Sequence, residues 1–343
     1  MANIRMITGI PETYEDLTWV FIKTIPTGYT RIDIVADTYP ENSIKAAEHC
    51  RRGSSREIII RSPQSKIPRD FRGFLQNGKN KKRMIMLMRE VLMKNQQKTL
   101  EMLNCKEIFF STLDDCIKIT ENCSCNIEGL ASNQEEADTK VVLHCKSAPA
   151  SSLNKSIILR SPSGDTDITR IMIEKFIEES ANCFLDYGSG QNRMGLWLNR
   201  VDLDKPLKEC VIGFHAFTGN DFVSSSFRKG NELCWKVFHA FQNLGVNWNL
   251  SDAIFDLLEE FVCFAYGDRR KSVNFVRHQM FQAKYKKHSK MVDLSLLPPC
   301  QSVLKLHGRR ANFVAKIWKS SDEAKVQIPE ISRHGWKSTG EIK

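Results

Sequence analysis

Two aspartates two residues apart, Asp165 and Asp167, have the spacing of a pair of metal ligands. They belong to Ser-Pro-Ser-Gly-Asp-Thr-Asp (161–167), which follows the apolar run 157–159 and precedes a helix-like run, 168–177. Open α/β sheets place their sites at the carboxyl ends of strands, so this position favours a site. Two carboxylates held so close repel each other unless a cation lies between them. The alternative is a surface turn in which an aspartate caps the following helix.

Further acids occur at three places where a strand would end or a helix would begin. Asp37 follows the β-branched run 30–36, Glu-Glu-Ala-Asp (135–138) opens a helix-like segment, and Asp221 follows Gly219 and Asn220. Hard divalent cations such as Mg²⁺ prefer carboxylate oxygens and water. Two such ions can stabilise the attacking and leaving oxygens in phosphodiester cleavage, which needs carboxylates from several segments.

The hydrophobic pattern indicates which elements must position these acids. Strands alternating with helices over the first 220 residues predict an α/β fold with a parallel sheet, and the last third predicts helices alone. Residues 53–80 are rich in Gly, Ser, Pro and charge, so we expect a long mobile insertion or arch there. Strands are expected at 30–36, 107–111, 117–120, 157–159, 184–187 and 211–217, and helices at 14–24, 43–52, 84–103, 134–145, 168–177, 233–244, 251–266, 273–287 and 299–318.

Composition and charge limit the classes of protein to which the chain can belong. The 343 residues are 41% hydrophobic and 26% charged, and no apolar run approaches the length of a membrane span. Residues 1–11 lack the apolar core of a secretion signal, and eleven scattered cysteines favour a reducing compartment. We therefore expect an intracellular protein that does not enter membranes.

The net charge of +10 is concentrated in one segment. Residues 45–94 hold 14 Lys or Arg and 4 Asp or Glu, a surplus of 10, so the rest of the chain is neutral overall. A concentrated basic segment is the electrostatic pattern expected for binding a polyanion such as nucleic acid. The alternatives are a solvated basic surface and a nuclear-import-like run at 79–83; a nuclear location is favoured over a cytoplasmic one.

The acid motifs, in their order, resemble those of a nuclease family. Asp37-Thr-Tyr-Pro, Glu136-Ala-Asp138, Asp165-Thr-Asp167 and Gly219-Asn-Asp221 are similar to the metal-binding motifs of the flap-endonuclease (XPG-like) branch of PIN-like nucleases. The longer runs at 135–140, 213–221 and 297–318 resemble a set of mobile-element-related invertebrate proteins. The resemblance covers about residues 30–320. It implies a PIN-like parallel twisted sheet flanked by helices, with an all-helical C-terminal extension.

The same resemblance implies a role for each matching residue. Mg²⁺ or Mn²⁺, in a two-metal site, would be held by the catalytic acids Asp37, Glu136, Asp138, Asp165, Asp167 and Asp221, while Glu135 is expected to be a solvated charge. The basic residues Lys45, Arg51 and Arg52 would contact phosphates as the arch of the family does. In the family the Gly-x-Asp motif opens a helix-two-turn-helix that grips duplex backbone, and residues 221–230, with Lys229, would take that part.

One departure from the family divides the functional hypotheses. The family begins with a central strand that ends in Asp, and residues 1–26 contain no apolar strand of that kind. The sequence therefore predicts either a divalent-metal-dependent, structure-recognising nuclease or a degenerate member, acting on DNA in preference to RNA. The alternative is a non-catalytic nucleic-acid-binding or interaction protein. A third hypothesis is a small-molecule hydrolase that uses the same acids on nucleotides.

The expected domains are a nuclease core at 1–222 with a basic arch-like insertion at about 45–94, a helical extension at 223–318 and a flexible tail at 319–343. His215 is expected to be a core residue of an apolar strand, and the helix that ends at Trp318 is expected to pack against the domain. Zinc binding by Cys123 and Cys125 with His144 and Cys145 is disfavoured, because the spacing lacks a second Cys-x₂-Cys pair.

Overall fold

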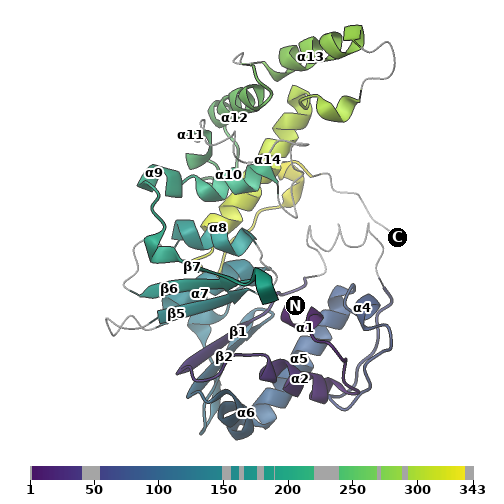
Figure 1. The fold of residues 1–343 in the computed structure, drawn as a ribbon, viewed down its shortest axis with the longest axis vertical. Helices are drawn as coiled ribbons and strands as arrows, with labels where there is room; N and C mark the ends of the chain where they lie inside the picture. The colour runs from purple at the N-terminus through teal and green to yellow at the C-terminus, as the bar shows by residue number, and fades with distance from the viewer. Residues whose placement is uncertain are drawn as a thin grey trace. The chain divides into compact units, whose positions relative to one another are not determined.

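The computed structural model describes residues 2–40, 55–148, 156–161, 166–175, 181–188, 190–219, 239–268, 272–287 and 293–336. These residues form two compact units (Figure 1). Unit 1 comprises Met1–Ile168, Glu178–Asn199 and Ser321–Val326, and unit 2 comprises Thr169–Ile177, Arg200–Ser320 and Gln327–Lys343. Several predictions fall outside the described residues, namely the helix at 43–52, the helix-two-turn-helix at 221–230, and the site residues Lys45, Arg51, Arg52, Asp165, Asp221 and Lys229.

Unit 1 contains two sheets that mix parallel and antiparallel pairs. The first has the order β1 (Arg31–Val35), β2 (Glu107–Thr112), β3 (Asp115–Ile119) and β4 (Ser124–Asn126), and only β1–β2 is parallel. The second has the order β5 (Ser156–Ser161), β6 (Asn182–Tyr187) and β7 (Met194–Trp197), and only β5–β6 is parallel. The α/β class is confirmed.

The prediction of one parallel sheet is wrong for the residues that the structure describes. The connection between β2 and β3 consists of only Leu113 and Asp114, with Leu113 at a positive φ of 50°. A two-residue connection allows only an antiparallel hairpin, because parallel neighbours need a long crossover. Among the strands that the structure describes, β1 and β5 each have one hydrogen-bonded neighbour and stand at one end of the strand order of their sheets.

The helices of unit 1 that precede β2 supply most of its apolar core. They are α1 (Ala2–Arg5), α2 (Tyr14–Lys23), α4 (Phe71–Phe74), α5 (Gly78–Lys94) and α6 (Gln96–Leu103). The predicted helix at 84–103 is divided at Asn95, whose side-chain amide donates to the carbonyl of Val91 over 2.8 Å. An asparagine that bonds the backbone in this way competes with helix continuation.

The expected mobile arch is wrong for the described part of its range. The backbone of residues 63–67 is hydrogen-bonded to residues 12–15, including Ile67 N to Glu12 O over 2.8 Å. Ile60 is buried in the core, and α5 buries its apolar face there as well. Residues 55–94 are therefore fixed to the body of unit 1.

The second half of unit 1 places a helix against β1 and completes the unit with short segments. α7 (Ala137–Ser147) packs on β1 and follows the short helix η1 (Glu128–Leu130). The short helices η2 (Gly190–Asn192) and η3 (Leu198–Arg200) flank β7. α8 (Thr166–Lys175) follows β5 and belongs to unit 2 from Thr169 onward.

The regular elements of unit 2 in its described residues are all helices. The sequence predicts helices alone for the last third of the chain. Its helices are α9 (Lys205–Lys208), α10 (Val211–Thr218), α11 (His239–Gln242), α12 (Asp252–Ala265), α13 (Val273–Lys287), η5 (Leu294–Leu296), α14 (Gln301–Lys319) and η6 (Ile331–His334). The helices predicted at 251–266, 273–287 and 299–318 are confirmed. None of the helices in the described ranges is long and apolar enough to cross a membrane.

The strand predicted at 211–217 is wrong, because this segment forms α10. Residues 211–217 are all buried, and an apolar run without periodicity does not distinguish a buried strand from a buried helix. His215 stacks on Trp318 with ring centroids 5.4 Å apart, which confirms both as core residues. α10 belongs to unit 2, whose longest segment begins at Arg200.

The flexible tail predicted at 319–343 is wrong for residues 319–336. Asn133 and Val326 exchange two hydrogen bonds, with Nδ2 donating to the Val326 carbonyl (2.8 Å) and Oδ1 accepting from its N–H (2.9 Å). Further along, His334 is buried and its ring lies 5.0 Å from that of Phe313. Residues 337–343 lie outside the described chain.

Candidate functional site

Asp37 meets the start of α7 across a separation of 100 residues. It follows the end of β1, and its Oδ1 accepts a hydrogen bond from the N–H of Ala137 over 3.0 Å. The first N–H groups of a helix have no partner within the helix and carry partial positive charge, so they favour a carboxylate. Asp37 thus contacts the backbone of the residue that lies between Glu136 and Asp138 in the sequence.

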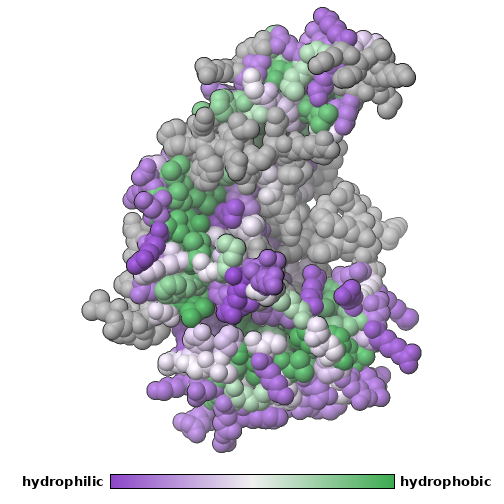
Figure 2. All heavy atoms as spheres, viewed as in Figure 1, coloured by the Kyte–Doolittle hydropathy of each residue, from purple (hydrophilic) through white to green (hydrophobic). Residues whose placement is uncertain are grey.

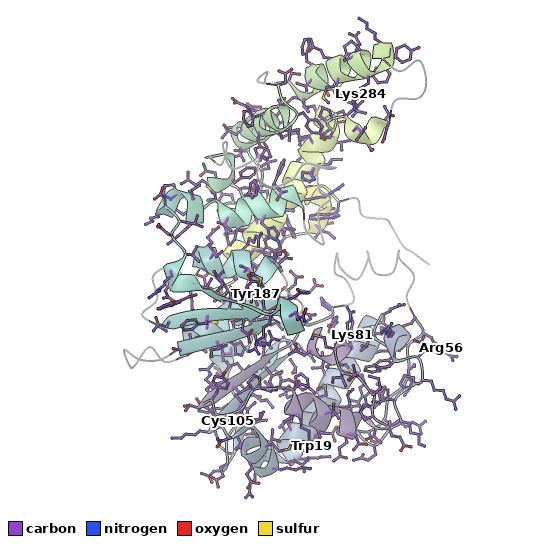
Figure 3. All side chains as sticks on the ribbon, in the orientation of Figure 1. Trp19, Arg56, Lys81, Cys105, Tyr187 and Lys284 are labelled. Atoms are coloured by element: carbon purple, nitrogen blue, oxygen red, sulfur yellow. The ribbon has the colours of Figure 1, made fainter. Side chains whose placement is uncertain are left out.

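Tyr39 holds the other oxygen of this carboxylate. Its hydroxyl donates to Asp37 Oδ2 over 2.9 Å, and its backbone has a positive φ of 45°. Burial, together with the charge of Asp37, raises the pKa of Tyr39 well above its usual value. The amine of Lys81, which Figure 3 labels, lies 4.2 Å from the centre of the Tyr39 ring. A left-handed non-glycine residue beside a carboxylate is a local feature that the surrounding packing must stabilise.

A buried lysine lies on the same helix, two residues beyond Asp138, the acid of the first turn. Lys140 is 1% exposed, and its Nζ donates to Thr38 Oγ1 (2.6 Å), to the carbonyl of Leu113 (2.5 Å) and to that of Ala36 (3.4 Å). Burial lowers the pKa of Lys140 to about 8, although nearby carboxylates, Asp37 first among them, oppose the shift. The amine thus ties α7 to the end of β1 and to the β2–β3 turn.

The other predicted acids differ in their exposure. Glu136 is buried at the N-cap position of α7, whereas Glu135, expected to be solvated, is half-buried and its carbonyl accepts from Thr38 N–H over 2.8 Å. Asp138 and Asp167 are half-buried, in the first turns of α7 and α8.

The described residues do not make a complete metal site. In the ranges given above, no three side chains of His, Cys, Asp or Glu are grouped as a metal ion would require. Both oxygens of Asp37 already accept from protein donors. The fit of Mg²⁺ or Mn²⁺ therefore depends on Asp165 and Asp221, which the structure does not describe.

A second polar cluster connects β1 to the end of α7. Asp33 Oδ2 lies 2.6 Å from His144 Nδ1, and Arg31 makes two hydrogen bonds of 2.7 Å to the same carboxylate. Burial would raise the pKa of Asp33, but the hydrogen bonds from His144 and Arg31 lower it overall. Four residues were considered above as zinc ligands. Of these, His144 contacts Asp33, Cys145 is buried, and Cys123 and Cys125 are exposed. This cluster fixes α7 against β1 at the end opposite to Asp37.

Exposed basic residues occupy the described part of the predicted nucleic-acid-binding segment. Five of them are exposed and, in the described chain, form no ion pair: Arg56, Arg61, Arg69, Arg72 and Lys82. Figure 3 labels Arg56 in this segment. Three others are paired with acids, namely Lys66 with Glu12, Lys79 with Glu57 and Lys94 with Glu90.

Some residues of the site have a signal in the sequence by which they could be predicted, and one has none. Lys140 lies three and four residues before Leu143 and His144, both buried, so helical spacing places it on the buried side of α7. Asp33 and Arg31 are two apart in a strand and therefore share a face. The role of Tyr39 has no sequence signal, because a positive φ is rare for tyrosine.

Comparisons of the chain with models of protein families, with curated proteins and with solved structures give no match.

Proposed function

We propose that the chain is a nucleic-acid-binding protein whose unit 1 contacts the phosphate backbone. The observation that carries this proposal is the set of five exposed basic residues, Arg56, Arg61, Arg69, Arg72 and Lys82, that no acid of the described chain neutralises. Four of the five are arginines, whose planar donor groups match the oxygens of a phosphate.

The surroundings of these residues support a contact surface in preference to a solvated one. Residues 55–94 are anchored to the core through Ile60 and α5, so the basic side chains project from a fixed backbone. Between Arg56 and Arg61, Ile58 is 38% and Ile59 is 85% exposed. Beside exposed arginines, such aliphatic side chains would add apolar contacts with base edges to the charge contacts with phosphates.

The test is salt-dependent binding in EDTA, followed by the anisotropy of a labelled 20-base-pair DNA duplex. We expect the triple variant Arg56→Ala/Arg61→Ala/Arg69→Ala to reduce the slope of log K against log [salt] by about 3, since each phosphate contact contributes roughly 0.9. The matched control replaces three exposed lysines outside this segment, Lys23, Lys106 and Lys325, by alanine. An equal decrease of the slope in the two variants would show that only the net charge of the protein matters, and would contradict a specific binding surface.

A second candidate function is metal-dependent phosphodiester hydrolysis, favoured by the meeting of Asp37 with Glu136 and Asp138 at the start of α7. Its test is cleavage of labelled single-stranded, duplex and flap DNA and RNA in Mg²⁺ or Mn²⁺. Loss of cleavage in Asp165→Asn/Asp167→Asn, with binding in EDTA unchanged, would support hydrolysis. No cleavage by the natural chain, with binding retained, would leave the binding function alone.

A further inference from the structure

In helix α13 of unit 2, the buried side chains among the described residues lie at its beginning. Val273 and Val276 are buried, and Glu259 of α12 accepts the N–H of Val273 over 2.9 Å. From residue 277 to residue 286 no side chain is buried. The described side chains of the helix beyond Val276 are therefore half-buried or exposed.

The exposed surface of α13 carries aromatic rings. Phe281 is 37% exposed and Tyr285 is 61% exposed, and their rings stack with centroids 6.0 Å apart and planes 16° apart. They are four residues apart, so they lie one above the other on the same side of the helix. In Figure 2 the α13 end of the molecule shows hydrophobic and hydrophilic side chains next to one another.

Positive charge surrounds these rings. Lys284 and Lys286 lie one residue to either side of Tyr285, about 100° around the helix in each direction. Neither lysine forms an ion pair within the described ranges (Figure 3 labels Lys284). The sequence from 269 to 290 has eight Lys or Arg and no Asp or Glu. Arg277, also on α13, donates to the carbonyl of Pro298.

We infer that α13 binds single-stranded nucleic acid, with bases stacking on Phe281 and Tyr285 and with Lys284 and Lys286 contacting phosphates. Stacking on exposed aromatic rings beside cationic side chains is how proteins hold single strands without reading sequence. This surface is distinct from the basic residues of unit 1 and needs no metal ion.

Two other occupants fit the same surface less well. An amphipathic helix that lies on a membrane has a continuous apolar face. On α13 the exposed rings alternate with Asn274, His278 and Gln282, and the last two are hydrogen-bonded to each other over 2.9 Å. An acidic protein would satisfy the lysines but gives no reason for paired, stacked rings.

The experiment uses the full chain in EDTA with fluorescein-labelled dT20, measured by anisotropy. Phe281→Leu/Tyr285→Leu keeps the apolar area but removes the rings, and we expect it to weaken binding at least about 5-fold, the lower limit for losing one stacked base. Phe281→Tyr/Tyr285→Phe exchanges the rings and should retain the natural affinity. Lys284→Ala/Lys286→Ala should reduce the salt slope by about 1.4, since each contact to a single strand contributes roughly 0.7.

A photocrosslink separates this inference from the function proposed for unit 1. A strand containing 5-bromodeoxyuridine should crosslink to the α13 peptide, also in the Arg56→Ala/Arg61→Ala/Arg69→Ala variant. Unchanged dT20 affinity in Phe281→Leu/Tyr285→Leu, or crosslinks confined to other peptides, would overturn the inference. Binding to phosphatidylserine vesicles but not to dT20 would overturn it in favour of a membrane surface.

Discussion

The buried amine of Lys140 makes the stability of unit 1 depend on pH. Its pKa falls from 10.5 to about 8 on folding, chiefly because of burial. Between these two values the unfolded chain binds a proton that the folded chain does not, so the free energy of unfolding increases as the pH rises. One pKa unit corresponds to about 1.4 kcal/mol, so the increase is about 3 kcal/mol over the whole window and about 2 to 3 kcal/mol between pH 7 and pH 10.

Lys140→Met isolates this contribution, because methionine keeps a long side chain and removes the charge. At pH 7 two effects oppose each other. The variant avoids the cost of burying a charge, about 3 kcal/mol, and loses three hydrogen bonds worth about 1 kcal/mol each. We therefore expect the two proteins to have unfolding free energies within about 1 kcal/mol at pH 7, and the natural chain to be the more stable one at pH 10.

The assay is urea unfolding of both proteins at pH 7, 8, 9 and 10. Titrations of other groups cancel when the curve of the variant is subtracted from that of the natural chain. Lys106→Met, at an exposed position in the same unit, is the matched control and should give a flat difference. A flat difference for Lys140→Met as well would refute the assignment of a depressed pKa to a buried, charged lysine.

Three further predictions concern stability. Asp37→Ala should lower the free energy of unfolding by about 1 to 3 kcal/mol, because the N–H of Ala137 loses its acceptor. Asp37→Asn keeps an acceptor and should lower the free energy of unfolding by less. Equal losses for the two variants in urea unfolding would contradict the role of Asp37 as a cap. Burial raises the pKa of Glu174 to about 7, so stability should fall as the pH rises from about 4.5 to about 7. Glu174→Gln should flatten that fall in thermal melts, and an unchanged slope would count against it. Asn312→Ala should lower the free energy of unfolding, measured in urea, by about 2 to 4 kcal/mol, because the Asn312 amide is hydrogen-bonded to three backbone groups of residues 245–248. A loss under 1 kcal/mol would show that water replaces the amide.

The elements with regular patterns could be predicted from the sequence. β1 is β-branched and alternating, and α12 and α14 repeat apolar residues at helical spacing, so local signals suffice for their type. α10 shows no helical periodicity, because apolar residues occur on all sides of the helix. The loops at 63–67 read as mobile from composition, yet their backbone groups bond to residues 12–15 that are about 50 positions away.

The site was predictable to the extent that it depends on strand ends and helix starts. Asp37 was expected beside Glu136 and Asp138 because those positions converge at a sheet edge, and the hydrogen bond to Ala137 agrees. The division into two sheets could not be predicted, because the sequence of a strand does not specify which distant strand it pairs with. Net charge gives no signal for the surface of α13, because the eight positive charges of residues 269–290 are offset elsewhere in the chain and the net charge outside 45–94 is zero.

The most direct test of nucleic-acid binding is the salt dependence of the natural chain's affinity for DNA in EDTA. We predict measurable binding at 50 mM salt and a log–log slope of about −4 to −5 on duplex, as expected if most of the five unpaired basic residues of unit 1 contact phosphates. Absence of binding at low salt, or binding that does not change between 50 and 200 mM salt, would contradict a phosphate-contacting surface.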